Sequence, residues 1–190
     1  VCHIERRDSM YNIKTIIWLL PILFMIHDFE EIIMAEAWSK RFKKELKEDT
    51  FMMKKKPFGL NDTGYWSTAA FSIGVEIIFV ILSVASILSC TFNSYFIWYG
   101  FLFAFTFHLI FAHFYLCIQF KHYVPGVVTS ALFLPVCIYI MYISKSLLKY
   151  DLSKVLLSCI AGIIFGIIIL ISLHDGIKNF SKLLKRYPLE

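Results

Sequence analysis

The chain has 190 residues, of which 58% are hydrophobic and 17% charged, and its mean hydropathy is +0.68. Water-soluble domains are about 45–50% apolar, so this composition excludes an ordinary soluble domain and predicts an all-α, polytopic transmembrane helical bundle. The formal net charge is +5, but the basic residues gather in short segments and do not interleave with aromatic residues, which argues against nucleic-acid binding.

Five segments are long and apolar enough to cross a bilayer, since a helical span needs about 20 mainly apolar residues. They form a single transmembrane domain over residues 13–174, with spans expected at about 13–38, 65–88, 95–120, 127–143 and 155–173. A basic loop at 39–64 and a basic tail at 175–190 complete the chain. Met10 stands directly before the first span, so translation is expected to begin at either Val1 or Met10.

The distribution of lysine and arginine predicts the orientation of the spans. The loop at 39–64 carries eight of these residues, and loops rich in lysine and arginine face the cytoplasm. Five alternating crossings then place the C-terminal tail in the cytoplasm and the N-terminus outside. The mildly basic link at 145–154 disagrees, because it falls outside. The expected location is a bacterial inner (plasma) membrane, and the oligomeric state is left open.

The first span contains a cluster of ionisable residues, His27-Asp28-Phe29-Glu30-Glu31. His27 is three positions from Glu30 and four from Glu31, so these three share a helical face, while Asp28 points about 100° away. Imidazole and carboxylate groups on one face are typical of zinc or iron sites. A hydrogen-bonded cluster without metal, or a path for protons or ions, is the alternative.

Later spans carry further candidates at a similar depth. Glu76 lies about 10 residues, or roughly 15 Å, from the expected cytoplasmic end of the second span, and His113 about 7 residues, or near 10 Å, from that of the third. Glu76 is a candidate ligand or general base, with a structural hydrogen bond as the alternative. His108 and His113 are about 140° apart on a regular helix, so we expect one of them, preferably His113, to reach the site.

The segment Tyr123-Val124-Pro125-Gly126 follows the third span and is expected to form a structural turn, because proline suits the first turn of a helix and glycine allows close packing. Together with His27-Asp28-Phe29-Glu30-Glu31 and a later histidine, His113 or His108, it resembles the HXXEE family of bacterial membrane proteins. The resemblance covers about residues 13–143. It implies that His27, Glu30, Glu31, Tyr123, Pro125 and Gly126 are signature positions, and it implies no activity.

The leading functional hypothesis is a membrane-embedded, metal-dependent enzyme with its site in the cytoplasmic half of the bilayer. A divalent metal, preferably zinc, would be held by His27, Glu30 or Glu31, and His113 or His108, with Glu31 or Glu76 as catalytic base. Iron is less favoured because histidine-rich boxes are missing. A hydrolase acting on a lipid or lipid-linked substrate is the simplest form. The alternatives are a proton- or ion-coupled transporter and a non-catalytic accessory protein.

Overall fold

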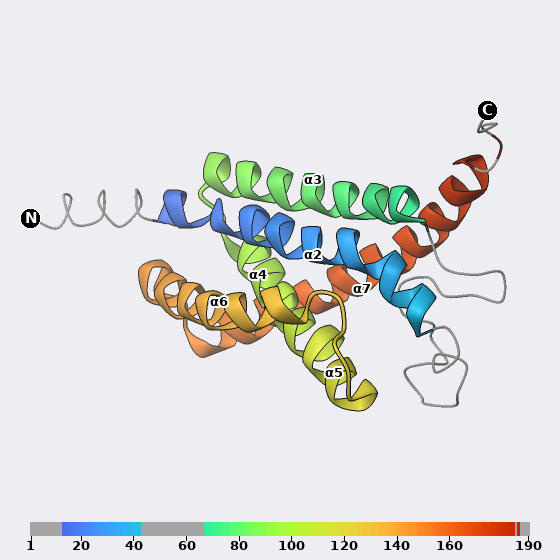
Figure 1. The fold of residues 1–190 in the computed structure, drawn as a ribbon. Helices are drawn as coiled ribbons and strands as arrows, with labels where there is room; N and C mark the ends of the chain where they lie inside the picture. The colour runs from blue at the N-terminus through green and yellow to red at the C-terminus, as the bar shows by residue number, and fades with distance from the viewer. Residues whose placement is uncertain (1–12, 43–66, 185, 187–190) are drawn as a thin grey trace, which may run out of the picture.

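The computed structural model describes residues 13–42, 67–184 and 186. Within this part the chain forms helices and no strand, so the predicted all-α fold is confirmed (Figure 1). The elements are α2 (Leu19–Arg41), α3 (Thr68–Phe92), α4 (Phe96–His108), the π-helix η4 (Leu109–Phe114), α5 (Tyr115–Phe120), α6 (Val127–Leu148) and α7 (Leu152–Leu184). Most of the predicted basic loop lies outside the described residues, and α7 carries the helix into the predicted tail as far as Leu184.

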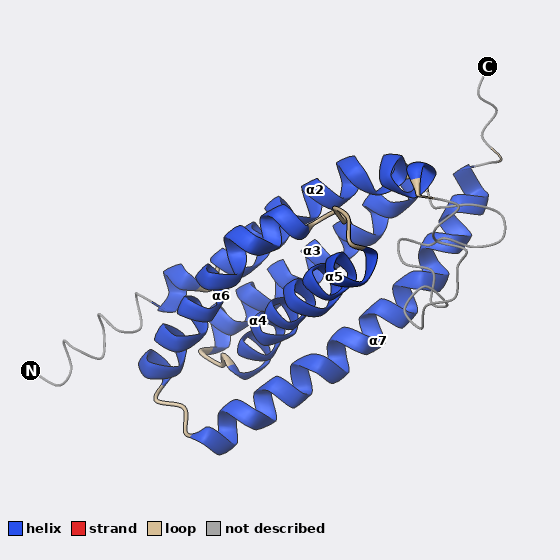
Figure 2. Ribbon diagram, turned by 60° about the horizontal axis from the view of Figure 1, so that its bottom comes forward, coloured by secondary structure: helices blue, strands red, loops and turns tan. Residues whose placement is uncertain are grey.

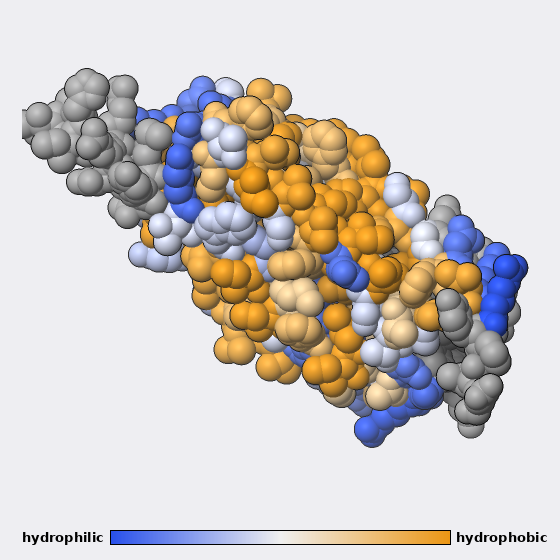
Figure 3. All heavy atoms as spheres, turned by 90° about the horizontal axis from the view of Figure 1, so that it is seen from above, coloured by the Kyte–Doolittle hydropathy of each residue, from blue (hydrophilic) through white to orange (hydrophobic). Residues whose placement is uncertain are grey.

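Helices α2, α3 and α6 run roughly alongside one another, whereas α4, η4 and α5 form one continuous rod that crosses them obliquely (Figure 1 and Figure 2). Among the residues that the structure describes, four segments are long and apolar enough to cross a membrane: Thr68–Phe92, Phe96–Phe120, Val127–Leu148 and Leu152–Leu173. In the most apolar stretch of each segment, only 11–39% of the residues are buried inside the protein. Apolar side chains cover the middle of the face in Figure 3, and hydrophilic residues gather towards both ends. This surface suits a hydrocarbon solvent.

Helix α2 has its charged face turned inwards. His27, Asp28 and Glu31 are buried, whereas Phe29 and Ile33 on the outer face are 49% and 69% exposed. A helix at a water-exposed surface has the opposite arrangement, with its apolar stripe facing the core. Because lipid replaces water around α2, this inverted pattern makes it the fifth span of the bundle and places its ionisable groups in the protein interior.

A proline near the start of α2 anchors this helix to its neighbours. Pro21 has no backbone N–H, so the carbonyl of Ile17 loses the donor that would complete the helical bond. Ile17 O instead accepts hydrogen bonds from Trp98 Nε1 at 3.0 Å and from Ser86 Oγ at 3.3 Å. A buried carbonyl is thereby satisfied, and α2 is fixed against α3 and α4.

Glycines bring α4 and α7 into backbone contact. A Cβ atom at Gly162 would overlap the backbone of Gly100, and one at Gly100 would lie 2.5 Å from Ser158 O. Small residues at such crossings let membrane helices associate closely, because packing rather than the hydrophobic effect holds them together. Ser158 Oγ also donates to Phe96 O at 2.5 Å.

We therefore expect Gly162→Ala to destabilise the bundle by about 1–3 kcal/mol, because even one methyl group must push the two backbones apart. Thermal unfolding of the detergent-solubilised protein measures this effect. Gly166→Ala is the matched control on the same helix, since a Cβ there makes an ordinary 3.7 Å contact with Ala104 Cβ. Equal melting temperatures for the two variants would contradict the close crossing.

Candidate metal centre

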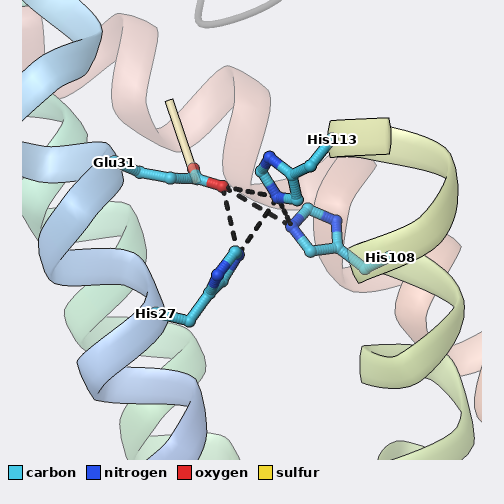
Figure 4. Close-up of side chains that lie close together, drawn as sticks. All are labelled: His27, Glu31, His108 and His113. Atoms are coloured by element: carbon cyan, nitrogen blue, oxygen red, sulfur yellow. Dashed lines mark hydrogen bonds and ion pairs between the residues drawn. The ribbon is translucent and has the colours of Figure 1, made fainter. Parts of the chain in front are cut away.

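Two residues of α2 form one wall of the site. His27 and Glu31 are four positions apart, so their side chains leave the helix on the same face. That face points into the bundle, and the exposed fractions of His27 and Glu31 are 0% and 5%. Figure 4 shows both side chains pointing from α2 towards two histidines on the facing rod.

The facing histidines are His108, which ends α4, and His113, in η4. Their five-residue spacing predicted that only one could face the site, and this prediction is wrong. In η4 the Tyr115 N–H donates to the Ile110 carbonyl five residues earlier, and this wider π-helical turn brings residues five apart onto one face. His108 Nε2 and His113 Nε2 consequently lie 3.1 Å apart (Figure 4).

The four side chains offer one ligand atom each, all within 4.8 Å of one another. His113 Nε2 lies 3.0 Å from His27 Nε2 and 2.9 Å from Glu31 Oε1. Glu31 Oε1 lies 3.4 Å from His27 Nε2 and 3.6 Å from His108 Nε2. Two ligands of a tetrahedral zinc ion, each at about 2.0–2.1 Å, are about 3.3 Å apart, and the five pairs at 2.9–3.6 Å are close to that value.

Hydrogen bonds on the far side of two rings determine which nitrogen faces the centre. His113 Nδ1 lies 2.8 Å from Pro125 O, which can only accept, so Nδ1 carries the proton. His27 Nδ1 lies 2.8 Å from Thr129 Oγ1, whose own proton is donated to Glu30 Oε2 at 2.7 Å. In the neutral tautomers both Nε2 atoms therefore present lone pairs to each other, and a cation between them would stabilise that arrangement.

Charge balance also favours a cation. Asp28 and Glu31 are both buried carboxylic residues. Asp28 Oδ2 accepts no hydrogen bond from the described residues, and the neighbours of Glu31 Oε1 are the three imidazoles of the cluster. No lysine or arginine is buried in the described part of the chain. Uncompensated charge is expensive in the interior of a membrane protein. A divalent ion would neutralise two carboxylates at once.

Glu30, predicted as an alternative ligand, lies outside this cluster. Its Oε1 accepts from Tyr123 Oη at 2.7 Å, and its Oε2 accepts from Thr129 N and Thr129 Oγ1 at 2.8 and 2.7 Å. Adjacent residues diverge by about 100° on a helix, so only Glu31 follows His27 into the cluster. Burial and the bond to Glu30 raise the pKa of Tyr123 above its ordinary value, which keeps this phenol a donor.

The turn before α6 contacts the histidine rings directly. Gly126 has a φ of +85°, a region that favours glycine. A Cβ atom there would also overlap His113 Cε1 and lie 2.6 Å from His113 Nδ1 and 3.0 Å from His27 Cε1. Pro125 contributes the carbonyl that accepts from His113, and Trp38 Nε1 donates to Tyr123 O. The expected structural turn therefore also orients the ligands.

A cavity of about 410 Å³ adjoins the cluster. Asp28, Glu31, His108 and His113 line it together with apolar residues of α3, α4 and α7. Glu76, predicted as a catalytic base, is exposed on α3 and does not line this cavity. The depth of Glu76 resembled that of the cluster, but depth does not determine the direction in which a side chain leaves its helix.

Sequence reasoning missed two residues of the site, Asp28 and Thr129. The stripe Ile22, Ile26, Phe29 and Ile33 is exposed, and its spacing of four, three and four residues marks the lipid-facing side of α2. Asp28 lies off that stripe, so this pattern was the signal for its burial. For Thr129 the sequence offered no signal, because its role depends on contact with a different helix.

Fold and site together define an integral membrane protein with a buried His/Glu group that can hold a metal ion. A family model described as "Protein of unknown function with HXXEE motif" matches residues 18–140, more than half of the chain. The chain belongs to this family, as its resemblance suggested. Comparison with curated proteins and with solved structures gave no match.

Thr129→Val is expected to weaken metal binding by roughly 10–100-fold, because valine cannot accept from His27 Nδ1 or donate to Glu30. Thr129→Ser retains the hydroxyl and is expected to bind nearly as the wild type does. Competition titration of the purified protein against a zinc-sensitive dye measures both affinities. Equal affinity of Thr129→Val and the wild type would show that this hydroxyl does not orient His27.

Proposed function

We infer that this protein is a membrane-embedded, metal-dependent enzyme, and specifically a hydrolase acting on a lipid or lipid-linked substrate. The observation that carries this proposal is the position of the cluster: three imidazoles and one carboxylate converge at the wall of an apolar cavity. A purely structural cluster would need no such cavity. An enzyme needs both ligands and space for a substrate.

Zinc is the ion that this ligand set suits best. His27 and His113 would supply nitrogen atoms and Glu31 an oxygen atom, at mutual separations of 2.9–3.4 Å. Three protein ligands leave the fourth tetrahedral position of a catalytic zinc ion for water, and His108 would border that position. Zinc bound there would polarise an ester carbonyl or phosphoryl group as a Lewis acid and activate water. The side chain of His108 is 36% exposed, whereas those of His27 and His113 are 0% exposed, so His108 is the edge of the cluster open to a substrate.

Asp28 takes the role of general base in this proposal, in place of Glu76. It is buried, lines the cavity beside the ligands, and has an oxygen that accepts no hydrogen bond from the described residues. A carboxylate in that position can accept the proton of an attacking water. Glu31 is assigned as a ligand, because its Oε1 lies among the three Nε2 atoms.

The distribution of basic residues supports a site near the cytoplasmic face of a bacterial inner membrane. Lys40 and Arg41 end α2, and Lys182 lies in the last turn of α7. Both helix ends lie at the same end of the bundle (Figure 1), as the positive-inside rule requires if this end is cytoplasmic.

The test combines metal analysis with a lipid assay on the protein purified without chelators and reconstituted in vesicles of bacterial lipid extract. We expect stoichiometric zinc and a lipid product that disappears after chelation and returns with zinc. Asp28→Asn should retain the metal and lose at least about 100-fold in rate, while Glu76→Gln should behave as the wild type. Absence of metal would overturn the proposal, and ion flux abolished by Glu76→Gln would favour the transporter.

A further inference from the structure

The cavity beside the cluster is polar on one side only. Of the residues that line it, those with polar side chains are Asp28, Glu31, His108 and His113. The remaining wall consists of apolar residues and glycine from α2, α3, α4, η4, α5 and α7. A ligand that fits this wall must itself be apolar over most of its length, because an unpaired polar group there would lose its hydrogen bonds to water.

The cavity is elongated along the helices. Its lining on α3 runs from Phe71 to Leu82, and its lining on α7 runs from Gly166 to Ile177. Each stretch covers a rise of roughly 16 Å at 1.5 Å per residue. Because spans and lipid chains both run across the bilayer, this long, narrow space is parallel to the chains of the surrounding lipid.

The cavity reaches the outer surface of the bundle beside α7. Leu170 lines it and is nevertheless 55% exposed. Leu170 lies within the apolar segment Leu152–Leu173, which is long enough to span the membrane. An opening at this height faces the hydrocarbon of the bilayer, so a lipid chain can enter sideways without crossing water.

We propose that this cavity is a binding site for one acyl chain of a membrane lipid, which enters beside Leu170 and brings its ester group to His108 and Asp28. This inference deepens the proposed hydrolase function and rests on it for the role of the ester group. A small polar solute does not match the apolar wall.

Shape controls occupancy of this site. An acyl chain that moves from the bilayer into the cavity gains no hydrophobic free energy, because lipid tails are as apolar as leucine. Binding therefore depends on the space available and on the contact at the cluster. Filling the cavity with a large side chain should exclude the acyl chain without changing the metal ligands.

Two pairs of variants separate the cavity from the lipid-facing surface. Ile78 on α3 and Ile169 on α7 line the cavity, whereas Ile77 and Ile168, their neighbours in sequence, do not and are 41% and 53% exposed. Ile78→Trp and Ile169→Trp fill the cavity from opposite walls. Ile77→Trp and Ile168→Trp introduce the same side chain on the outside.

The probe is phosphatidylglycerol with a photoreactive diazirine on one acyl chain, in nanodiscs holding the full-length protein. After irradiation, peptide mass spectrometry locates the labelled residues, and zinc content is measured on the same samples. We expect the buried cavity residues Val75 and Phe105 to be labelled in the wild type. We expect at least a fivefold loss of this label in each cavity variant, with label retained in both outer variants and zinc retained in all four.

Lack of label at Val75 and Phe105 in the wild type would overturn the inference, as would label that persists in both cavity variants. The wild-type result does not depend on whether any variant folds. Zinc and lipid turnover without cavity label would remove this inference and leave the hydrolase proposal standing. Labelling of Val75 and Phe105 in a protein that binds no zinc would support the acyl-chain site and overturn the hydrolase proposal.

Discussion

If the cluster binds zinc as proposed, replacement of His113 by alanine is expected to reduce the zinc content to less than about a tenth of the wild-type content. Loss of a hydrogen-bond partner of a ligand typically weakens metal binding tenfold to hundredfold, and loss of the ligand itself should weaken it more. His113 makes the two shortest contacts of the cluster, both with residues of α2: 2.9 Å to Glu31 Oε1 and 3.0 Å to His27 Nε2. Elemental analysis of the purified variant measures the loss.

The control for this prediction is His122→Ala. The His122 ring is exposed and stacks on Phe42, with ring centroids 5.5 Å apart, and it is not part of the cluster. This variant should keep its full zinc content and melt at the wild-type temperature. If His113→Ala retained zinc as His122→Ala does, the assignment of the cluster as a metal centre would be wrong.

Gly126→Ala is expected to destabilise the protein by about 1–3 kcal/mol and to weaken zinc binding by roughly 10–100-fold. Two physical effects combine at this position. An L-residue is strained at a φ of +85°, and its Cβ atom would overlap the His113 ring. The ring must then move away from the position in which Nδ1 donates to Pro125 O and Nε2 faces the cluster.

Thermal unfolding and zinc titration, performed on the same preparation, measure the two effects of Gly126→Ala. Gly176→Ala in α7 is the matched control, because a Cβ built there has no atom of the described side chains within 4 Å. That variant should be as stable as the wild type or slightly more stable, since alanine favours a helix. Unchanged zinc affinity in Gly126→Ala would show that the turn does not orient the ligands.

The candidate site was only partly predictable from the sequence. His27 and Glu31 could be paired because four residues make about one helical turn, and the structure brings them together. The choice between Glu30 and Glu31 could not be made, because both occupy the same half of the helix. It depends on Tyr123 and Thr129, which bind Glu30 from a segment more than ninety residues later.

Hydropathy is a local property of the chain, so the sequence by itself determined the helical class, the approximate apolar segments and the presence of costly charges in the first span. The tertiary structure decided what those charges do. The π-helical turn η4 lets both His108 and His113 face α2. The packing of the bundle also directs Asp28 into the cavity and leaves Glu76 of α3 exposed. These outcomes depend on contacts between segments far apart in the chain, and periodicity within one helix carries no information about them.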